Sequence, residues 1–157
     1  MADISTHITP KILIQDGAFN IQEEMKSITA NNKNIGAIVC FDGLCRDEEG
    51  VLSALEIEHY PLMAEKAITQ IAQSALERWQ LQAITVIHRY GKINVGDDIV
   101  LVITASTHRQ AAFEAASFIM DFLKTDAPFW KKEHRKDGTA TKWVSAQEKD
   151  EAIKKRW

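Results

Sequence analysis

One segment decides the fold of this chain: Asp121-Phe122-Leu123-Lys124-Thr125-Asp126-Ala127-Pro128-Phe129-Trp130-Lys131-Lys132. Apolar residues recur with helical periodicity up to Lys124. Pro128 then disfavours the α conformation at Ala127, so the helix is predicted to end in the Thr125-Asp126 turn. Two aromatic residues and two lysines follow immediately, at the start of a predicted strand.

Lys124 and Lys131 are the candidate catalytic residues of this segment. A lysine at a helix end and another beside aromatic rings can both lose solvent, and desolvation lowers the pKa of a lysine toward the range that a catalytic amine needs. The alternative is structural. Cations favour helix C-termini, so Lys124 can serve as a helix-end charge and Lys131 as a solvated strand residue.

Composition predicts one soluble globular domain spanning residues 1–157. The 157 residues are 45% hydrophobic and 26% charged, which is ordinary for such a domain. No apolar stretch approaches the ~20 residues that cross a bilayer, and the N-terminus lacks the pattern of a secretory signal. Cys40 and Cys45 are an odd number of residues apart in one apparent strand, which argues against a disulfide or a shared metal ion. We therefore expect a reducing cytoplasmic location.

The charges are distributed unevenly along the chain. Residues 1–123 carry 9 basic and 16 acidic side chains, whereas residues 124–157 carry 10 basic and 6 acidic ones. The positive C-terminal region suits an anionic ligand or an acidic partner tail better than nucleic acid, because a nucleic-acid-binding domain is usually basic overall.

Periodicity predicts an α+β fold, because helices and strands mix without strict βαβ alternation. Ile99 to Ala105 is apolar throughout and is predicted to be a central strand buried on both faces. The strands near 35–41 and 51–60 are predicted to form a hairpin, and Ser145 to cap a terminal helix. The predicted strands are 7–15, 35–41, 51–60, 83–90, 99–105, 129–134 and 140–144; the predicted helices are 19–30, 61–79 and 108–124; 91–98 is a predicted connection.

His108 and Arg109 form a second candidate site at the start of the last long helix. Thr107 and Gln110 have the spacing of a capping box, which places both cations in the first helical turn. Cations are unfavourable there, so a bound phosphate or carboxylate would explain them; an ordinary surface pair is the alternative. Sixteen residues separate His108 from Lys124, which is ~24 Å along a helix. We therefore expect a site shared across a symmetric dimer, with the helix start supplied by the partner chain.

Other polar residues are weaker candidates. Arg46, at a predicted strand end, is a possible third anion ligand or a surface residue that offsets the acidic run 47–49. His59 and His88 lie within strands and are predicted to be packing residues. Asp97-Asp98 is predicted to be a turn. The sequence shows no metal-ligand cluster, phosphate-binding glycine loop or nucleophile elbow.

Several motifs together resemble one family, the catalytic (large) subunits of molybdopterin synthase. They are Glu58-His59-Tyr60-Pro61-x-Met63-x-Glu65-Lys66-Ala67, Val86-Ile87-His88-Arg89-x-Gly91, Ser106-x-His108-Arg109, Phe118-Ile119-Met120-Asp121-x-Leu123-Lys124-Thr125-x-Ala127-Pro128-Phe129-Trp130-Lys131 and the closing Lys155-Arg156-Trp157. The resemblance runs from about Gly36 to Trp157. It is specific because independent motifs occur in the right order.

The resemblance implies an α/β hammerhead-type fold with a mixed or antiparallel sheet and a small additional β subdomain. It also implies a homodimer that binds two small ubiquitin-like sulfur carriers to form a heterotetramer. The carrier's C-terminal Gly-Gly thiocarboxylate would deliver sulfur to cyclic pyranopterin monophosphate, and two transfers would form the molybdopterin dithiolene. Lys124 and Lys131 match the family's catalytic positions, and Arg46, His108 and Arg109 match its substrate-binding positions. No metal or other cofactor is implied.

The chain departs from the family pattern at two places. The first is the segment around Arg46, where Asp42-x-Leu44-Cys45 comes before the arginine and the acidic run 47–49 comes after it. The second is Lys142, which stands where an arginine is usual. One alternative function is a non-catalytic module that binds an acidic partner protein. A phosphohydrolase is disfavoured, because the sequence shows neither a metal site nor an activated nucleophile.

Overall fold

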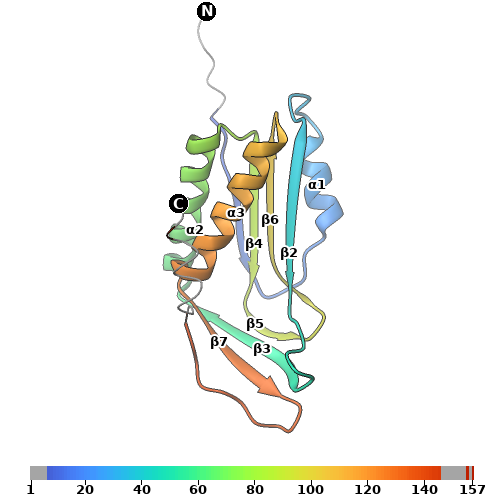
Figure 1. Cartoon of the computed structure of the whole chain (residues 1–157), viewed down its shortest axis with the longest axis vertical. Helices are drawn as coiled ribbons and strands as arrows, with labels where there is room; N and C mark the ends of the chain where they lie inside the picture. The colour runs from blue at the N-terminus through green and yellow to red at the C-terminus, as the bar shows by residue number, and fades with distance from the viewer. Residues whose placement is uncertain (1–6, 146–154, 156) are drawn as a thin grey trace, which may run out of the picture.

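The computed structural model of the chain describes residues 7–145, 155 and 157. In chain order, its elements are β1 (Lys11–Gln15), α1 (Ile21–Thr29), β2 (Ala37–Leu44), β3 (Leu52–His59), α2 (Pro61–Trp79), β4 (Ala83–Arg89), β5 (Gly91–Asn94), β6 (Asp98–Ser106), α3 (Arg109–Thr125) and β7 (Phe129–Arg135). Helices and strands are mixed, and the predicted α+β class is confirmed (Figure 1).

The larger sheet has the strand order β1-β4-β6-β2. β1 is parallel to β4, whereas β6 is antiparallel to both of its neighbours, so the sheet is mixed. β6 lies inside the sheet and is buried from Val100 to Ser106, which confirms the predicted central strand. Alternate residues of β6 point to opposite faces. Val100 and Val102 pack with α2 and α3, whereas Leu101 and Ile103 pack with α1 (Figure 1).

A second sheet has the strand order β5-β3-β7, and both of its pairings are antiparallel. It has a core of its own, in which Cys45, Leu52, Ile57 and Ile93 are buried. This sheet is the predicted small β subdomain. Figure 1 shows that it lies across one end of the larger sheet, next to the C-terminal end of α3.

The predicted hairpin of residues 35–41 and 51–60 is wrong, because the two strands belong to different sheets. β2 pairs with β6, and a register irregularity at Gly43/Leu44 ends that pairing. The Cys45 N–H then donates to the Asp97 carbonyl (2.9 Å), and the Gly96 N–H donates to the Cys45 carbonyl (2.8 Å). These bonds tie the end of β2 to the β5–β6 connection and carry the chain into the second sheet.

Two further predictions at the edges of this sheet need correction. Residues 91–94 were predicted to be part of a connection, but they form β5 because they pair with β3. The predicted strand 140–144 is reduced to two isolated bridges, Lys131 with Val144 and His134 with Ala140, on either side of the Asp137-Gly138 turn. The helix predicted after Ser145 lies outside the described residues.

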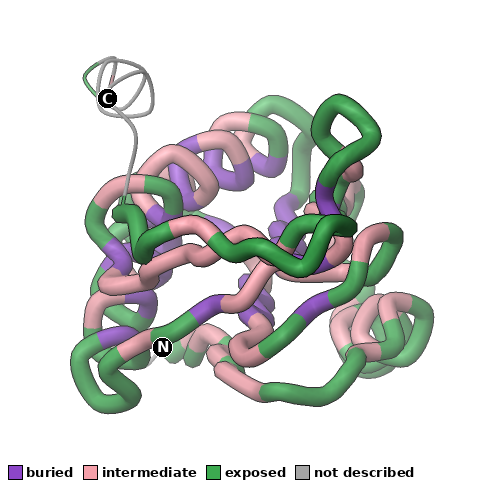
Figure 2. Tube along the Cα trace, turned by 90° about the horizontal axis from the view of Figure 1, so that it is seen from below, coloured by how far each residue is buried: buried purple, intermediate pink, exposed green. Residues whose placement is uncertain are grey.

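The residues of α2 and α3 that face the larger sheet are the buried ones. The buried residues of α2 and α3 lie on one side of each helix, as Figure 2 shows in purple. Pro61 occupies the first turn of α2 as predicted, where its missing N–H costs no hydrogen bond. Among the described residues, no helix combines the length and the apolar character needed to cross a membrane.

Gly36, just before β2, lies very close to the backbone that leads into α3. Its N–H donates to the Ser106 carbonyl (2.9 Å), and a Cβ placed on it would lie 2.2 Å from the Thr107 carbonyl oxygen. We expect Gly36→Ala to lower the free energy of unfolding by about 1–3 kcal/mol, because backbone must move to relieve the overlap. Urea denaturation at 25 °C measures this change.

Gly17→Ala is the matched control, since nothing lies within 4 Å of a Cβ placed there. That substitution is expected to leave stability unchanged or to raise it by up to about 1 kcal/mol. Equal losses in the two variants would show that the close approach at Gly36 does not limit stability.

Candidate functional site

A cavity of ≈ 290 Å³ lies where the two sheets and the end of α3 meet. Lys124, Lys131 and His88 supply its nitrogen-bearing side chains, and Glu48 its carboxylate. The other described residues of the wall are largely apolar and come from β2, β6, α3, β7, the turn between α3 and β7, and the segment after β7: Phe41, Gly43, Leu44, Ile99, Val100, Met120, Leu123, Ala127, Phe129, Val144 and Ser145. The structure therefore brings the two predicted catalytic lysines into one cavity.

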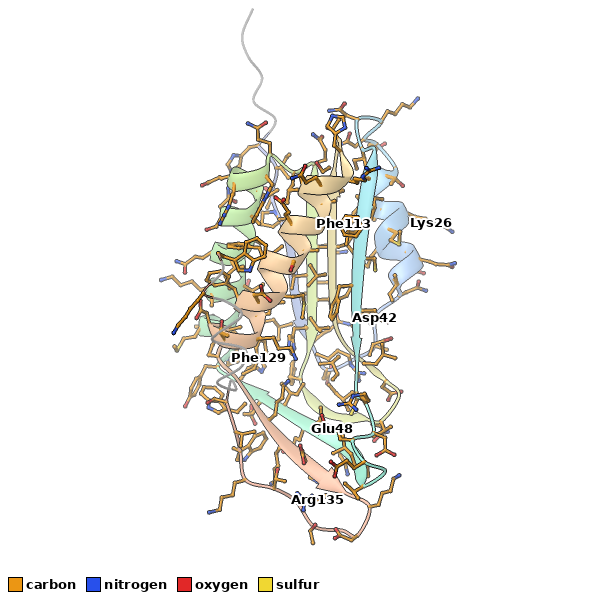
Figure 3. The ribbon with its side chains drawn as sticks, viewed as in Figure 1. Lys26, Asp42, Glu48, Phe113, Phe129 and Arg135 are labelled. Atoms are coloured by element: carbon orange, nitrogen blue, oxygen red, sulfur yellow. The ribbon has the colours of Figure 1, made fainter. Side chains whose placement is uncertain are left out.

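Lys124 reaches this cavity because α3 ends where the sequence predicts. The last helical residue is Thr125, and the Asp126 N–H donates to the Phe122 carbonyl (2.8 Å). The Phe129 N–H then donates to the Ala127 carbonyl (2.8 Å), which turns the chain directly into β7. Figure 3 shows Phe129 beside this end of α3.

Lys131 is held by backbone pairing on both sides of β7. It lies opposite Ile57 of β3. On its other side, its N–H donates to the Val144 carbonyl (2.9 Å), and its carbonyl accepts from the Val144 N–H (2.8 Å). Lys131 is partly buried whereas Lys124 is exposed, which agrees with the expectation that Lys131 is the more desolvated of the two.

Only one of the two aromatic residues before Lys131 shares its cavity. Successive residues of a strand point to opposite faces, so Phe129 and Lys131 lie on the same face and Trp130 on the other. Phe129 lines the lysine cavity, whereas Trp130 lines a separate hollow with Glu58, His59, Tyr60 and Trp143. The desolvation predicted from both rings therefore comes from Phe129 and the other apolar residues of the cavity.

His88 was predicted to be a packing residue, and the structure places it in the cavity wall. It is 7% exposed, and its ring stacks on Phe129 with centroids 3.9 Å apart and planes at 12°. His88 Nδ1 lies 2.8 Å from the Arg89 carbonyl oxygen. One sequence signal could have identified it: it is the first strongly polar residue at the end of the otherwise apolar run Ala-Ile-Thr-Val-Ile of β4.

Burial lowers the pKa of His88 from 6.5 to about 4, and desolvation of the imidazolium is the main cause. The hydrogen bond to the Arg89 carbonyl raises the pKa, but Lys131, Lys124 and His59 lower it further. His88 is therefore neutral at neutral pH, and among the described residues of the wall the positive charge belongs to the lysines.

Arg46 lies beside the cavity and outside its described wall. Its side chain is 78% exposed, and its guanidinium is 3.1 Å from the carboxylate of Glu48, which does line the cavity. Because this ion pair is exposed and therefore weak, Arg46 can leave Glu48 and bind an anion at the mouth of the cavity instead. Lys142 is exposed and has no place in the described wall.

His108 and Arg109 lie at the other end of α3, away from the cavity (Figure 1). His108 is the N-cap residue and Arg109 the first helical residue; both are exposed. The predicted capping box is wrong. The Gln110 side chain instead donates to Glu114 (3.1 Å), and among the described residues no side chain caps the helix. The first N–H groups of α3 thus remain available to an anion.

Comparisons with known proteins place the chain in a family. The model of a family described as MoaE protein matches residues 14–126. A molybdopterin synthase catalytic subunit of Mesorhizobium japonicum is 56% identical over 154 residues, which are 98% of this chain and 97% of that protein.

The chain belongs to the MoaE family.

Solved structures agree with this assignment. A molybdopterin biosynthesis MoaE protein from Burkholderia ambifaria superposes with a TM-score of 0.82 at 43% identity, covering 95% of this chain and 98% of that one. A molybdopterin synthase from Staphylococcus aureus gives a TM-score of 0.75 at 31% identity, covering 88% and 99%. The fold expected from the resemblance is thereby confirmed.

The MoaE-family cavity has the chemistry of an anion site with a proton-handling group. Two ammonium groups that share one cavity attract an anion, and the apolar residues around them limit the water that screens the charge of the partly buried Lys131. Among the described residues, no group of three or more His, Cys, Asp and Glu side chains is placed to hold a metal ion.

Asp42 is a second residue near the cavity whose pKa is shifted. Burial raises the pKa of Asp42 from 3.8 to about 6, and the neighbouring Asp98 carboxyl adds to the rise. Asp42 is adjacent in β2 to the cavity residues Phe41 and Gly43, so its own side chain lies on the opposite face of the strand. A carboxyl with a raised pKa stabilises the folded state as pH falls, whereas His88 does the reverse.

We expect the low pKa of His88 to make stability depend on pH. Below pH 6.5 the unfolded chain protonates this histidine, but the folded chain does not until about pH 4, so stability is lost as pH falls through that interval. The wild type should lose on the order of 2 kcal/mol between pH 7 and pH 5 relative to His88→Gln.

Urea denaturation of both proteins at the two pH values measures this difference. Asp42 is present in both proteins, so its opposite contribution cancels. Parallel pH dependences would show that His88 is not held neutral by the fold.

Proposed function

We propose that this chain is the catalytic subunit of a molybdopterin synthase. In this proposal, it transfers sulfur from the C-terminal Gly-Gly thiocarboxylate of a small ubiquitin-like carrier to cyclic pyranopterin monophosphate. The convergence of Lys124 and Lys131 on one cavity carries the proposal, together with membership of a family whose relatives are molybdopterin synthase catalytic subunits. The name of those relatives implies a further subunit, which supports a carrier protein as partner.

The cavity suits the end of such a carrier. A glycine tail has no side chains, so its backbone needs little space in a cavity of ≈ 290 Å³. Its terminal thiocarboxylate is an anion, and the two lysines provide the opposite charge. Each transfer forms a C–S bond on the pterin in place of a C–O bond and breaks the acyl C–S bond of the carrier. The carrier is left with an ordinary carboxylate, whose new oxygen comes from water. Proton transfer is therefore required beside the anion, and a lysine amine can supply it.

The two lysines have different environments and, in this proposal, different roles. Lys131 is partly buried between paired backbone segments and is assigned the proton transfer. Lys124 is exposed at the C-terminal end of α3, where the helix dipole favours its charge, and it is assigned the binding of the carrier's end.

The substrate phosphate is assigned to Arg46 and to His108 and Arg109 of a partner chain. β2 is an edge strand of the larger sheet. Its end at Leu44 borders the cavity, and its start at Ala37 lies beside the start of α3, through the contact of Gly36 with Ser106 and Thr107. Antiparallel contact of two β2 strands across a two-fold axis would place one chain's His108 and Arg109 beside the other's cavity.

The direct test mixes the purified chain with thiocarboxylated carrier and cyclic pyranopterin monophosphate. Formation of the dithiolene product, detected by mass spectrometry, is expected. Carrier binding without any product would favour the alternative, a non-catalytic module that binds a partner protein.

We expect Lys131→Ala to abolish turnover while carrier binding remains nearly intact. Lys124→Ala should also impair turnover, but with weaker binding of the carrier's end. Lys131→Arg should not restore activity, because arginine keeps the charge and cannot release a proton near neutrality. Single-turnover sulfur transfer and calorimetric carrier binding measure both effects; transfer at the wild-type rate by Lys131→Arg would leave Lys131 with a purely electrostatic role.

We expect the shared site to be visible in mixed dimers. Arg109→Ala should raise KM through a loss of about 1.5–3 kcal/mol, as for a hydrogen bond to a charged group. An equal mixture of Arg109→Ala and Lys131→Ala chains, exchanged into hybrids, should recover about a quarter of the wild-type activity, because half of the dimers contain one intact site.

Light scattering establishes that the mixed chains are dimeric. Hybrids that stay as inactive as their parents would mean that Arg109 acts within its own chain, and a monomer that is fully active with its carrier would exclude the shared site.

A further inference from the structure

His88 is a buried, nitrogen-bearing member of the cavity wall to which the mechanism above gives no role. Two elements, β4 and β7, fix its ring. β4 carries it, Phe129 of β7 stacks on it at 3.9 Å, and the Arg89 carbonyl lies 2.8 Å from Nδ1. Phe129 is also 5.9 Å from the ring of His59, which in turn contacts Tyr90 at 4.6 Å. The imidazole therefore has little freedom to rotate.

The contact with Arg89 sets the tautomer of His88. A backbone carbonyl can only accept a hydrogen bond, so Nδ1 must be the protonated nitrogen. In a neutral ring the other nitrogen, Nε2, then carries a lone pair. Among the described residues, no group donates to Nε2, and the ring forms part of the cavity wall.

The charged and titratable groups that act on this ring come from three elements. Lys131 of β7 and Lys124 of α3 are cations, and His59 of β3 is the third group. All three disfavour the imidazolium, so the ring remains a neutral acceptor in the cavity that it shares with the two lysines. An acceptor in that position can orient an ammonium group without cancelling its charge.

We propose that His88 is a positioning residue for Lys131, with Nε2 accepting a hydrogen bond from the Lys131 ammonium group when the carrier's end occupies the cavity. This inference rests on the proposed function. Backbone pairing fixes the main chain of Lys131, and its amine lies at the end of a long side chain with several rotatable bonds. A fixed acceptor would hold the amine in the orientation that faces the thiocarboxylate, and orientation of this kind contributes to rate.

Three substitutions separate this role from packing. His88→Gln places an amide oxygen near the position of Nε2, whereas His88→Asn places an amide N–H near Nδ1 and nothing near Nε2. His88→Phe keeps the stacking on Phe129 and removes both nitrogens. We expect Asn and Phe to slow single-turnover sulfur transfer about 10- to 100-fold, as for a lost hydrogen bond to a charged group, with carrier Kd unchanged. The Gln variant should retain most of the rate.

A rate that is equal in the Asn and Gln variants would overturn the inference, because a packing role does not distinguish them. Loss of carrier binding in step with the rate would also overturn it. If the wild type forms product and the Asn variant transfers sulfur at the same rate, His88 does not position Lys131, but the proposed function is unaffected.

NMR of ¹⁵N-histidine in the wild type needs neither turnover nor a folded variant of His88. At pH 7 the spectrum should show the Nδ1–H tautomer. Addition of carrier with an ordinary C-terminal carboxylate should shift the Nε2 resonance toward the hydrogen-bonded value. That shift should vanish in Lys131→Ala and persist in Lys136→Ala, the matched control, whose lysine pairs with Asp47 beyond the far end of β7.

An Nε2–H tautomer, no shift on addition of carrier, or a shift that survives Lys131→Ala would each overturn the inference. The expected shift in a protein that makes no product would instead overturn the proposed function and leave the positioning of Lys131 in place.

Discussion

The site depends on where α3 stops. Pro128 offers no backbone N–H and excludes the α conformation from Ala127, so the chain cannot continue the helix past Thr125. The chain then turns within three residues into β7, and that short turn is what places Lys124 and Lys131 on one cavity. One more helical turn would move the first residue of β7 by about 5 Å along the helix axis, away from its pairing with β3.

The cavity confines positive charge without burying it completely. A fully buried ammonium group would lose its proton, and a fully exposed one would be screened by water. Lys124 is exposed and Lys131 partly buried, so the two lie between these limits. The neutral His88 fits the same requirement, because a third cation beside the lysines would oppose both of them. The exposed ion pair of Glu48 and Arg46 stands at the rim, where a charged ligand can displace it at little cost.

Hydrophobic periodicity and helix-breaking residues such as proline predicted most helices and strands well, because these signals are local in the sequence. The central strand β6, the helix opened by Pro61 and the end of α3 follow from residues within one turn or strand. The pairing of β2 could not be obtained in this way. A short acidic turn between two strands is typical of a hairpin, but the hydrogen bonds of Cys45 to the distant Gly96 and Asp97 direct the chain into another sheet. The capping box failed for a similar reason, since Gln110 has a competing partner in Glu114.

Of the residues that line the cavity, the sequence singled out the two lysines, whose charge stands out, and treated His88 as a packing residue. His88 has the local pattern of a packing histidine, and only the approach of Phe129 and Lys131 from another sheet gives it a place in the cavity. The separation of His108 and Arg109 from the lysines followed from helical rise alone and agrees with the structure. That separation limits what one chain can do. A rigid helix between two cationic sites keeps them apart in any state that retains the fold, so a small substrate can meet both only where two chains are in contact.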